Sequence, residues 1–109
     1  MERGEYVRLI LDEYRSTPGV AGVVRRADRL LAAQLHERGV AFETVANAFV
    51  LAASRRLARP EEASPLGTIR SLAYFSPVID EVLESNVSSQ YFDYLRHRLR
   101  RGASRSSQG

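Results

Sequence analysis

The chain contains no cysteine and no lysine, and none of its apolar stretches approaches the length of a membrane-spanning helix. Without cysteine, neither a disulfide framework nor a thiolate metal site is possible, which fits a reducing compartment. A helix that crosses a bilayer needs about 20 mostly apolar residues. The opening "MERGEYVRLI" carries acids where a signal peptide needs a basic segment. We therefore expect a soluble, cytoplasmic protein with no membrane partner.

The short motifs that mark many active sites are missing as well. There is no G-x-S-x-G nucleophile elbow, and "PGVAG" lacks the lysine and the spacing of a phosphate-binding loop. His36 and His97 have no partner at the i, i+4 spacing of helical metal ligands. Asp80 and Glu84 share a helical face, but exposed acids at this spacing are typical of a solvated surface. We predict a protein that is not an enzyme, with no catalytic residues, metal ligands or cofactor.

Apolar residues recur throughout with the helical period of 3.6, and no stretch alternates with period two. A chain of 109 residues fits one domain with a sizeable core. The prediction is a compact, single-domain, all-α bundle of four to five helices over residues 1–101, followed by a disordered basic tail at 102–109.

The predicted helices cover about residues 4–16, 27–38, 42–58 and 89–101, and the apolar residues from Ile69 to Leu83 keep one helical face across Pro77. Gly39 is expected to cap the second helix in a left-handed conformation, and the third helix has an apolar face wide enough to be central. Pro77 predicts either a kink or a restart with Ser76 as N-cap. The residues predicted to face inward are Tyr6, Val7, Ile10, Leu11, Tyr14, Leu30, Leu31, Leu35, Phe42, Val45, Ala46, Phe49, Ala52, Ala53, Leu57, Ile69, Leu72, Phe75, Ile79, Val82, Leu83, Tyr91, Phe92, Leu95 and Leu99.

All 16 positive side chains are arginine, and their distribution divides the chain into segments of different net charge. Residues 1–60 hold ten arginines and seven acids, residues 61–93 hold one arginine and six acids, and residues 94–109 hold five arginines and no acid. A GC-rich genome would produce the same preference for arginine over lysine. Arginine is also the residue that binds phosphate through two parallel hydrogen bonds, so the location of the charge matters more than its total.

Nine residues form the predicted nucleic-acid-binding set. The arginines of the last helix suit a phosphate groove, those of "ASRRLAR" widen the patch, and an exposed tyrosine beside an arginine can stack a base. The alternative interpretation is that the arginines keep the helix ends soluble and interact favourably with the helix dipole. The set comprises Arg55, Arg56, Arg59, Arg70, Tyr74, Arg96, Arg98, Arg100 and Arg101.

A helix–turn–helix interpretation of "LLAAQLHERGVAFETVANAF" is less favourable. Leu35 is bulky where that motif prefers a small residue. The helix that would read bases carries Glu43 and no basic residue.

The segments "LAAQLHERGVAFETVANAFVLAASRRLARP", "IRSLAYFSPVIDEVL" and "YFDYLRHRL" resemble a group of small, mostly uncharacterised helical proteins associated with bacterial mobile DNA elements. Less closely, Tyr74, Ile79 and Leu83 are similar to the signature of the C-terminal domain of DnaD-type primosome proteins. That second resemblance implies a helical domain that helps to load replication machinery and binds single-stranded DNA.

Together these features predict a non-catalytic accessory nucleic-acid-binding protein that acts in the replication or transposition of a mobile element. The competing prediction is a protein-interaction adaptor, in which the acidic 61–93 region and an exposed Tyr74 form the contact surface. The sequence leaves the oligomeric state open.

Overall fold

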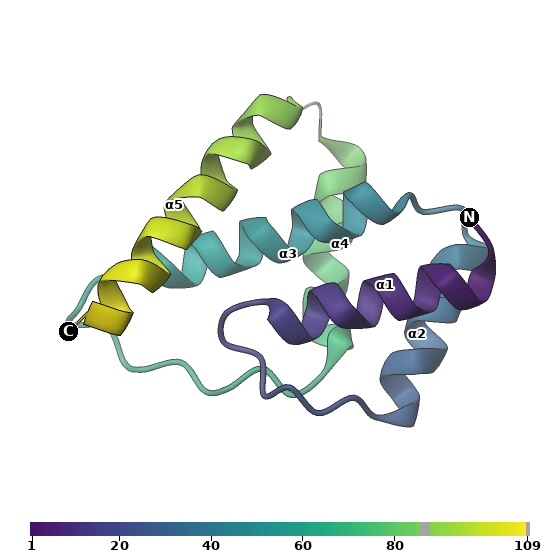
Figure 1. The fold of residues 1–109 in the computed structure, drawn as a ribbon, viewed down its shortest axis with the longest axis horizontal. Coiled ribbons are helices and arrows are strands. Elements are labelled where there is room, and N and C mark those ends of the chain that lie inside the picture. The colour runs from purple at the N-terminus through teal and green to yellow at the C-terminus, as the bar shows by residue number, and fades with distance from the viewer. Residues whose placement is uncertain (86–87, 109) are drawn as a thin grey trace.

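The computed structural model describes the backbone of residues 1–85 and 88–108, and the side chains of these residues as far as Arg101. The described residues form five α-helices and one short 3-10 helix, with no strand, which confirms the predicted all-α class (Figure 1). These elements are α1 (Arg3–Ser16), α2 (Arg26–Glu37), α3 (Phe42–Leu57), η1 (Leu72–Phe75), α4 (Ser76–Glu84) and α5 (Ser89–Gln108).

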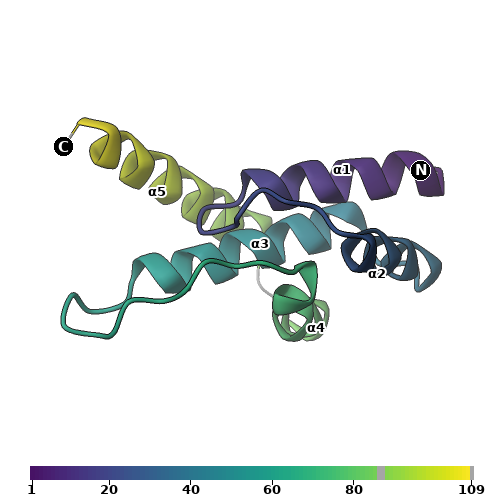
Figure 2. The ribbon, with the colours of Figure 1, turned by 90° about the horizontal axis from the view of Figure 1, so that it is seen from below.

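Helix α3 is the centre of the molecule, as its wide apolar face predicted. Figure 2 shows α1 and α5 on one side of α3 and α4 on the other, with α2 at one end. Val45, Ala48 and Phe49 of α3 are almost fully buried. Alanine is frequent along α3, and its small side chain lets the neighbouring helices pack close to the backbone.

Three aromatic side chains from distant parts of the chain form the middle of the core. The ring centroids of Phe49 and Phe75 lie 4.8 Å apart, and that of Tyr14 lies 6.1 Å from Phe75. Both contacts have the edge-to-face geometry that aromatic pairs favour. The Tyr14 hydroxyl has no hydrogen-bond partner among the described residues. Its pKa is raised, mainly by burial and further by the negative charge of Asp28, while Arg25 opposes the shift.

Gly39 ends α2 in the predicted way. It has φ +73°, a conformation that glycine adopts at no steric cost, and its N–H donates to the carbonyl of His36. The chain then turns into α3 through Val40, whose carbonyl accepts a 2.8 Å hydrogen bond from the buried Tyr6 hydroxyl. This bond fixes α1 against the turn between α2 and α3.

Two long connections run beside each other below the helices in Figure 1. Val20 and Ile69 form an isolated parallel bridge in which the Ile69 N–H donates to the Gly19 carbonyl at 2.8 Å. The Ile69 carbonyl in turn accepts from the Ala21 N–H at 2.9 Å. The bridge holds the segment before α2 against the segment before η1.

At Pro77 the helix restarts, which is the second of the two predicted outcomes. Ser71 caps η1 by accepting a hydrogen bond from the Ala73 N–H, and Ser76 and Pro77 lie in the first turn of α4. The predicted N-cap was one residue late, because Phe75 is the N-cap and Ser76 is already helical. Proline is tolerated here because the first N–H groups of a helix have no intrahelical partner.

Four residues predicted to face inward are exposed instead: Leu30, Leu57, Leu83 and Tyr91. In α2 the buried stripe includes Asp28, Ala32 and Leu35. The prediction used apolar residues only, so it did not include the buried carboxyl group of Asp28 in this stripe. With Asp28 on the buried face, Leu30 lies at the edge of that face and is exposed. Leu57 is the last residue of α3, and Tyr91 flanks the stripe that Phe92 and Leu95 bury.

Helix α5 begins at residue 89, as predicted, and its backbone is helical to Gln108, past the predicted end at about residue 101. The side chains of the predicted tail at 102–109 lie outside the described residues.

Candidate nucleic-acid interface

The last helix has one buried side and one free side. Phe92 and Leu95 are buried against α3, and Leu99 is half-buried, so these residues mark the inner stripe of α5. Residues at positions 94, 97, 98 and 101 follow the i, i+3, i+4, i+7 pattern on the other side. We call Tyr94, His97, Arg98 and Arg101 the α5 outer stripe.

All four residues of the α5 outer stripe are exposed. The Arg98 guanidinium carbon lies 5.9 Å from the centroid of the Tyr94 ring, within the range of a cation–π contact. Neither Arg98 nor Arg101 forms an ion pair with any described residue. The stripe therefore presents two uncompensated guanidinium groups and an aromatic ring to solvent.

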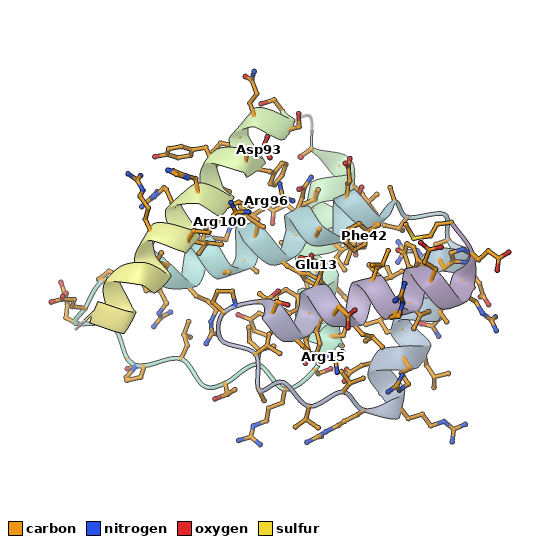
Figure 3. The ribbon with its side chains drawn as sticks, in the orientation of Figure 1. Glu13, Arg15, Phe42, Asp93, Arg96 and Arg100 are labelled. Atoms are coloured by element: carbon orange, nitrogen blue, oxygen red, sulfur yellow. The ribbon has the colours of Figure 1, made fainter. Side chains whose placement is uncertain are left out.

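The other two arginines predicted on α5 point elsewhere. In Figure 3, Arg96 and Arg100 lie on the side of α5 that faces α3 and α1. Arg96 donates to Asn47 of α3 at 2.6 Å and to Asp93 at 3.2 Å, so it joins two helices. Arg100 lines a shallow groove between α1, α3 and α5, together with Glu13. Of the four α5 arginines in the predicted set, Arg98 and Arg101 are on the free face.

The arginines at the end of α3 are held in three different ways. Arg55 donates two hydrogen bonds to the carboxylate of Glu81 on α4, so its charge is paired. Arg56 donates to the carbonyl of Gly67 at 2.8 Å, and its guanidinium carbon lies 5.9 Å from the Tyr74 ring centroid. Arg59 donates to the carbonyl of Ser64 at 2.8 Å. The carbonyl partners orient Arg56 and Arg59 without neutralising their charge.

The Arg55–Glu81 pair predicts a measurable lowering of the Glu81 pKa. The hydrogen bond from Arg55 lowers the pKa of Glu81 below its ordinary value, partly opposed by desolvation. The carboxylate form is therefore favoured in the folded protein, and the contribution of the pair to stability is lost as the pH falls through this lowered pKa. A carboxyl-detected NMR titration should show the shift in the natural chain and its disappearance in Arg55→Gln. An unchanged Glu81 titration in that variant would show that the pair does not form in solution.

Tyr74 lies at the rim of a groove between α3, η1 and the loop before it. The groove has a volume of about 370 Å³. Its lining residues are Ala52, Arg55, Arg56, Arg59, Leu66, Tyr74 and Val78, and we call it the arginine–tyrosine groove. Arg70, the remaining predicted residue, is exposed and has no polar partner among the described residues, and it does not line the groove.

The predicted set is therefore divided between two surfaces. The arginine–tyrosine groove is lined by residues from α3, η1, α4 and the loop before η1, and by none from α5. Figure 2 shows α4 and α5 on opposite sides of α3. The structure brings Arg56, Arg59 and Tyr74 together in one place, and Arg98 with Arg101 in another. The predicted single basic patch does not form.

Sequence reasoning missed Tyr94 and His97 as members of an exposed stripe. The signal was present in the sequence: Tyr94, Arg98 and Arg101 share a helical face that points away from Leu95. The arginines by themselves do not single out this face, because positions 96, 98, 100 and 101 spread around the non-core side of the helix.

No family model matches the chain, and no curated protein or solved structure is significantly similar to it. Among the described residues, no three acidic, histidine or cysteine side chains gather where they could hold a metal ion. None of the described helices is long and apolar enough to cross a membrane.

Proposed function

We propose that the protein is a non-catalytic accessory nucleic-acid-binding protein that contacts the phosphate backbone along the α5 outer stripe. The observation that carries the proposal is the Arg98 guanidinium over the exposed Tyr94 ring, with the unpaired Arg101 one helical turn further on. Arginine on phosphate and an aromatic ring on a base are the two contacts that bind nucleic acid without reading its sequence.

A role in the replication or transposition of a mobile element belongs to the same proposal. It rests on the resemblance of "IRSLAYFSPVIDEVL" and its neighbouring segments to small helical proteins that accompany such elements. A binding module without sequence preference suits an accessory role, because the associated machinery supplies the choice of site.

The competing adaptor function has less support from the structure. Three of the six acids in the 61–93 region are held in ion pairs: Asp80 with Arg38, Glu81 with Arg55 and Asp93 with Arg96. Tyr74 is exposed, but it lies against Arg56 and not within an acidic surface. Half of the acids that the adaptor would use as its contact surface are therefore paired within the molecule.

The direct test is fluorescence anisotropy of labelled single-stranded and duplex DNA against the full chain, from about 50 to 200 mM salt. We expect binding that weakens steeply with salt. The double variant Arg98→Gln/Arg101→Gln should reduce the slope of log affinity against log salt by about 1.8 for duplex DNA, since each lost phosphate contact contributes about 0.9. Tyr94→Ala should weaken binding to single strands more than to duplexes, because only unpaired bases can stack on the ring.

The matched control is Arg26→Gln/Arg29→Gln. It removes the same charge from two exposed residues of α2 that have no polar partner among the described residues. If it lowers affinity as much as the α5 variant does, binding depends on net charge alone and the proposed interface is wrong. Absence of binding by the folded protein at the lowest salt would reject the nucleic-acid function altogether.

A further inference from the structure

The arginine–tyrosine groove has the size of a small-molecule site. Ligand pockets in proteins have volumes of about 300–1,000 Å³, and the groove, at about 370 Å³, lies near the lower limit. This volume accommodates one molecule the size of a mononucleotide and is too small for a docked helix. None of the residues that line the groove belongs to α5, so the proposed function does not account for it.

The charge in the groove favours an anion. Arg56 and Arg59 are oriented by the carbonyls of Gly67 and Ser64, and neither forms an ion pair among the described residues. Arg55 is the exception, because Glu81 neutralises it. Arg56 also donates a 3.4 Å hydrogen bond to the Tyr74 hydroxyl. A guanidinium group has five N–H donors, so these bonds still leave donors free for a phosphate.

The backbone at Gly19 also packs against the Arg56 side chain. Gly19 has φ +93°, and a Cβ at this position would lie 3.1 Å from the Arg56 Nε atom. The bridge between Val20 and Ile69 holds the backbone of Gly19 in place. Arg56 is therefore confined between two loops and the Tyr74 ring, and little side-chain entropy remains to be lost when a ligand binds.

The walls of the groove favour a flat, apolar group beside the anion. The Tyr74 side chain is 46% exposed and Leu66 is 43% exposed, which leaves their apolar surfaces open to a ligand. Ala52 and Val78 add apolar surface to the lining. The Tyr74 ring is fixed by an edge-to-face contact with Phe75 at 5.2 Å, so it offers a rigid surface for stacking.

We propose that the arginine–tyrosine groove binds one nucleoside phosphate, with the base against Tyr74 and Leu66 and the phosphate on Arg56 and Arg59. A free nucleotide and the terminal unit of a nucleic-acid strand share this chemistry. The proposal is independent of the α5 outer stripe, since each surface has its own arginines.

Calorimetric titration of the full chain with ADP, pyrophosphate and adenosine tests the inference. ADP should bind, and each of the two fragments should bind at least about tenfold more weakly, because each makes only part of the contacts. Arg56→Gln should weaken ADP binding about tenfold, the loss expected for one charge-assisted hydrogen bond. Tyr74→Leu removes the surface for the base and one contact of Arg56, so it should weaken ADP binding more than it weakens pyrophosphate binding, whereas a general loss of structure would weaken both equally.

Arg26→Gln is the control for net charge, and ADP binding should be unchanged in it. Circular dichroism verifies the fold of each variant. If Arg56→Gln does not fold, Arg59→Gln removes the second phosphate contact from an exposed residue just beyond the end of α3. A short 5′-phosphorylated oligonucleotide that displaces ADP would assign the groove to strand ends, whereas failure to displace it would assign the groove to free nucleotides.

Several results would overturn the inference. If ADP does not bind, or if it binds equally well to the groove variants, the arginine–tyrosine groove is not a nucleotide site. If pyrophosphate binds as tightly as ADP, the base contributes nothing to binding, and the groove is an anion site only. A short acidic peptide that displaces ADP at lower concentration would assign the groove to a protein partner. If Arg98→Gln/Arg101→Gln abolishes ADP binding and the groove variants do not, ADP binds at α5 and the inference is wrong. The DNA binding of the same variant is a separate measurement that tests the proposed function.

Discussion

Replacing Phe75 with alanine is expected to lower the free energy of unfolding by about 3–5 kcal/mol. Phe75 is completely buried, and its ring makes edge-to-face contacts with Phe49 and Tyr14. The substitution removes apolar surface and leaves a cavity that three helices from separate parts of the chain would have to close. Urea denaturation followed by circular dichroism measures the effect.

Tyr74→Ala is the matched control for Phe75→Ala, because it removes the neighbouring ring of the same short helix. Tyr74 is exposed, and we expect a loss below about 1 kcal/mol. Since small domains are stable by only about 5–15 kcal/mol, Phe75→Leu is a milder second variant, with an expected loss of about 1 kcal/mol. Equal losses at positions 74 and 75 would contradict the packing described for η1.

Replacing Asp28 with alanine is expected to cost about 2–4 kcal/mol, the second-largest effect. Asp28 is 2% exposed, and its two carboxyl oxygens accept hydrogen bonds of 2.9 Å from the backbone N–H groups of Leu72 and Arg25. The first bond joins α2 to η1, and the second closes the cap of α2. Alanine would leave the Leu72 N–H buried without an acceptor, and such a group costs about 1–3 kcal/mol by itself.

Thermal or urea unfolding measures the loss, and hydrogen exchange locates it. In Asp28→Ala the Leu72 amide should lose protection before the amides in the middle of α3. Asp28→Asn should be intermediate, because its side chain keeps the shape but only one oxygen acceptor. Asp12→Ala removes an exposed acid that pairs with Arg15, and we expect a change within about 0.5 kcal/mol. A loss at position 28 no larger than at position 12 would mean that the buried bonds to Asp28 do not stabilise the fold.

The two candidate surfaces differ in how far the sequence could reveal them. The α5 outer stripe lies within a single helix, so the spacing of Tyr94, Arg98 and Arg101 already contains it. The arginine–tyrosine groove joins α3 to η1 through the loop between them, and Arg56 and Tyr74 are 18 positions apart. Their meeting depends on the path of that loop and on the bridge between Val20 and Ile69.

Helical periodicity determined the all-α class, the order and approximate bounds of the helices and the central place of α3, and the conformational freedom of glycine determined the cap at Gly39. These properties follow from contacts within one turn or one face, which local spacing records. Tertiary structure decided that Asp28 is buried and Leu30 exposed, that Arg96 joins α5 to Asn47, and that the arginines form two surfaces. Each of these outcomes depends on a partner elsewhere in the chain, such as the Leu72 N–H that meets Asp28 from 44 residues away. Only the packing of the helices brings such partners within hydrogen-bond distance.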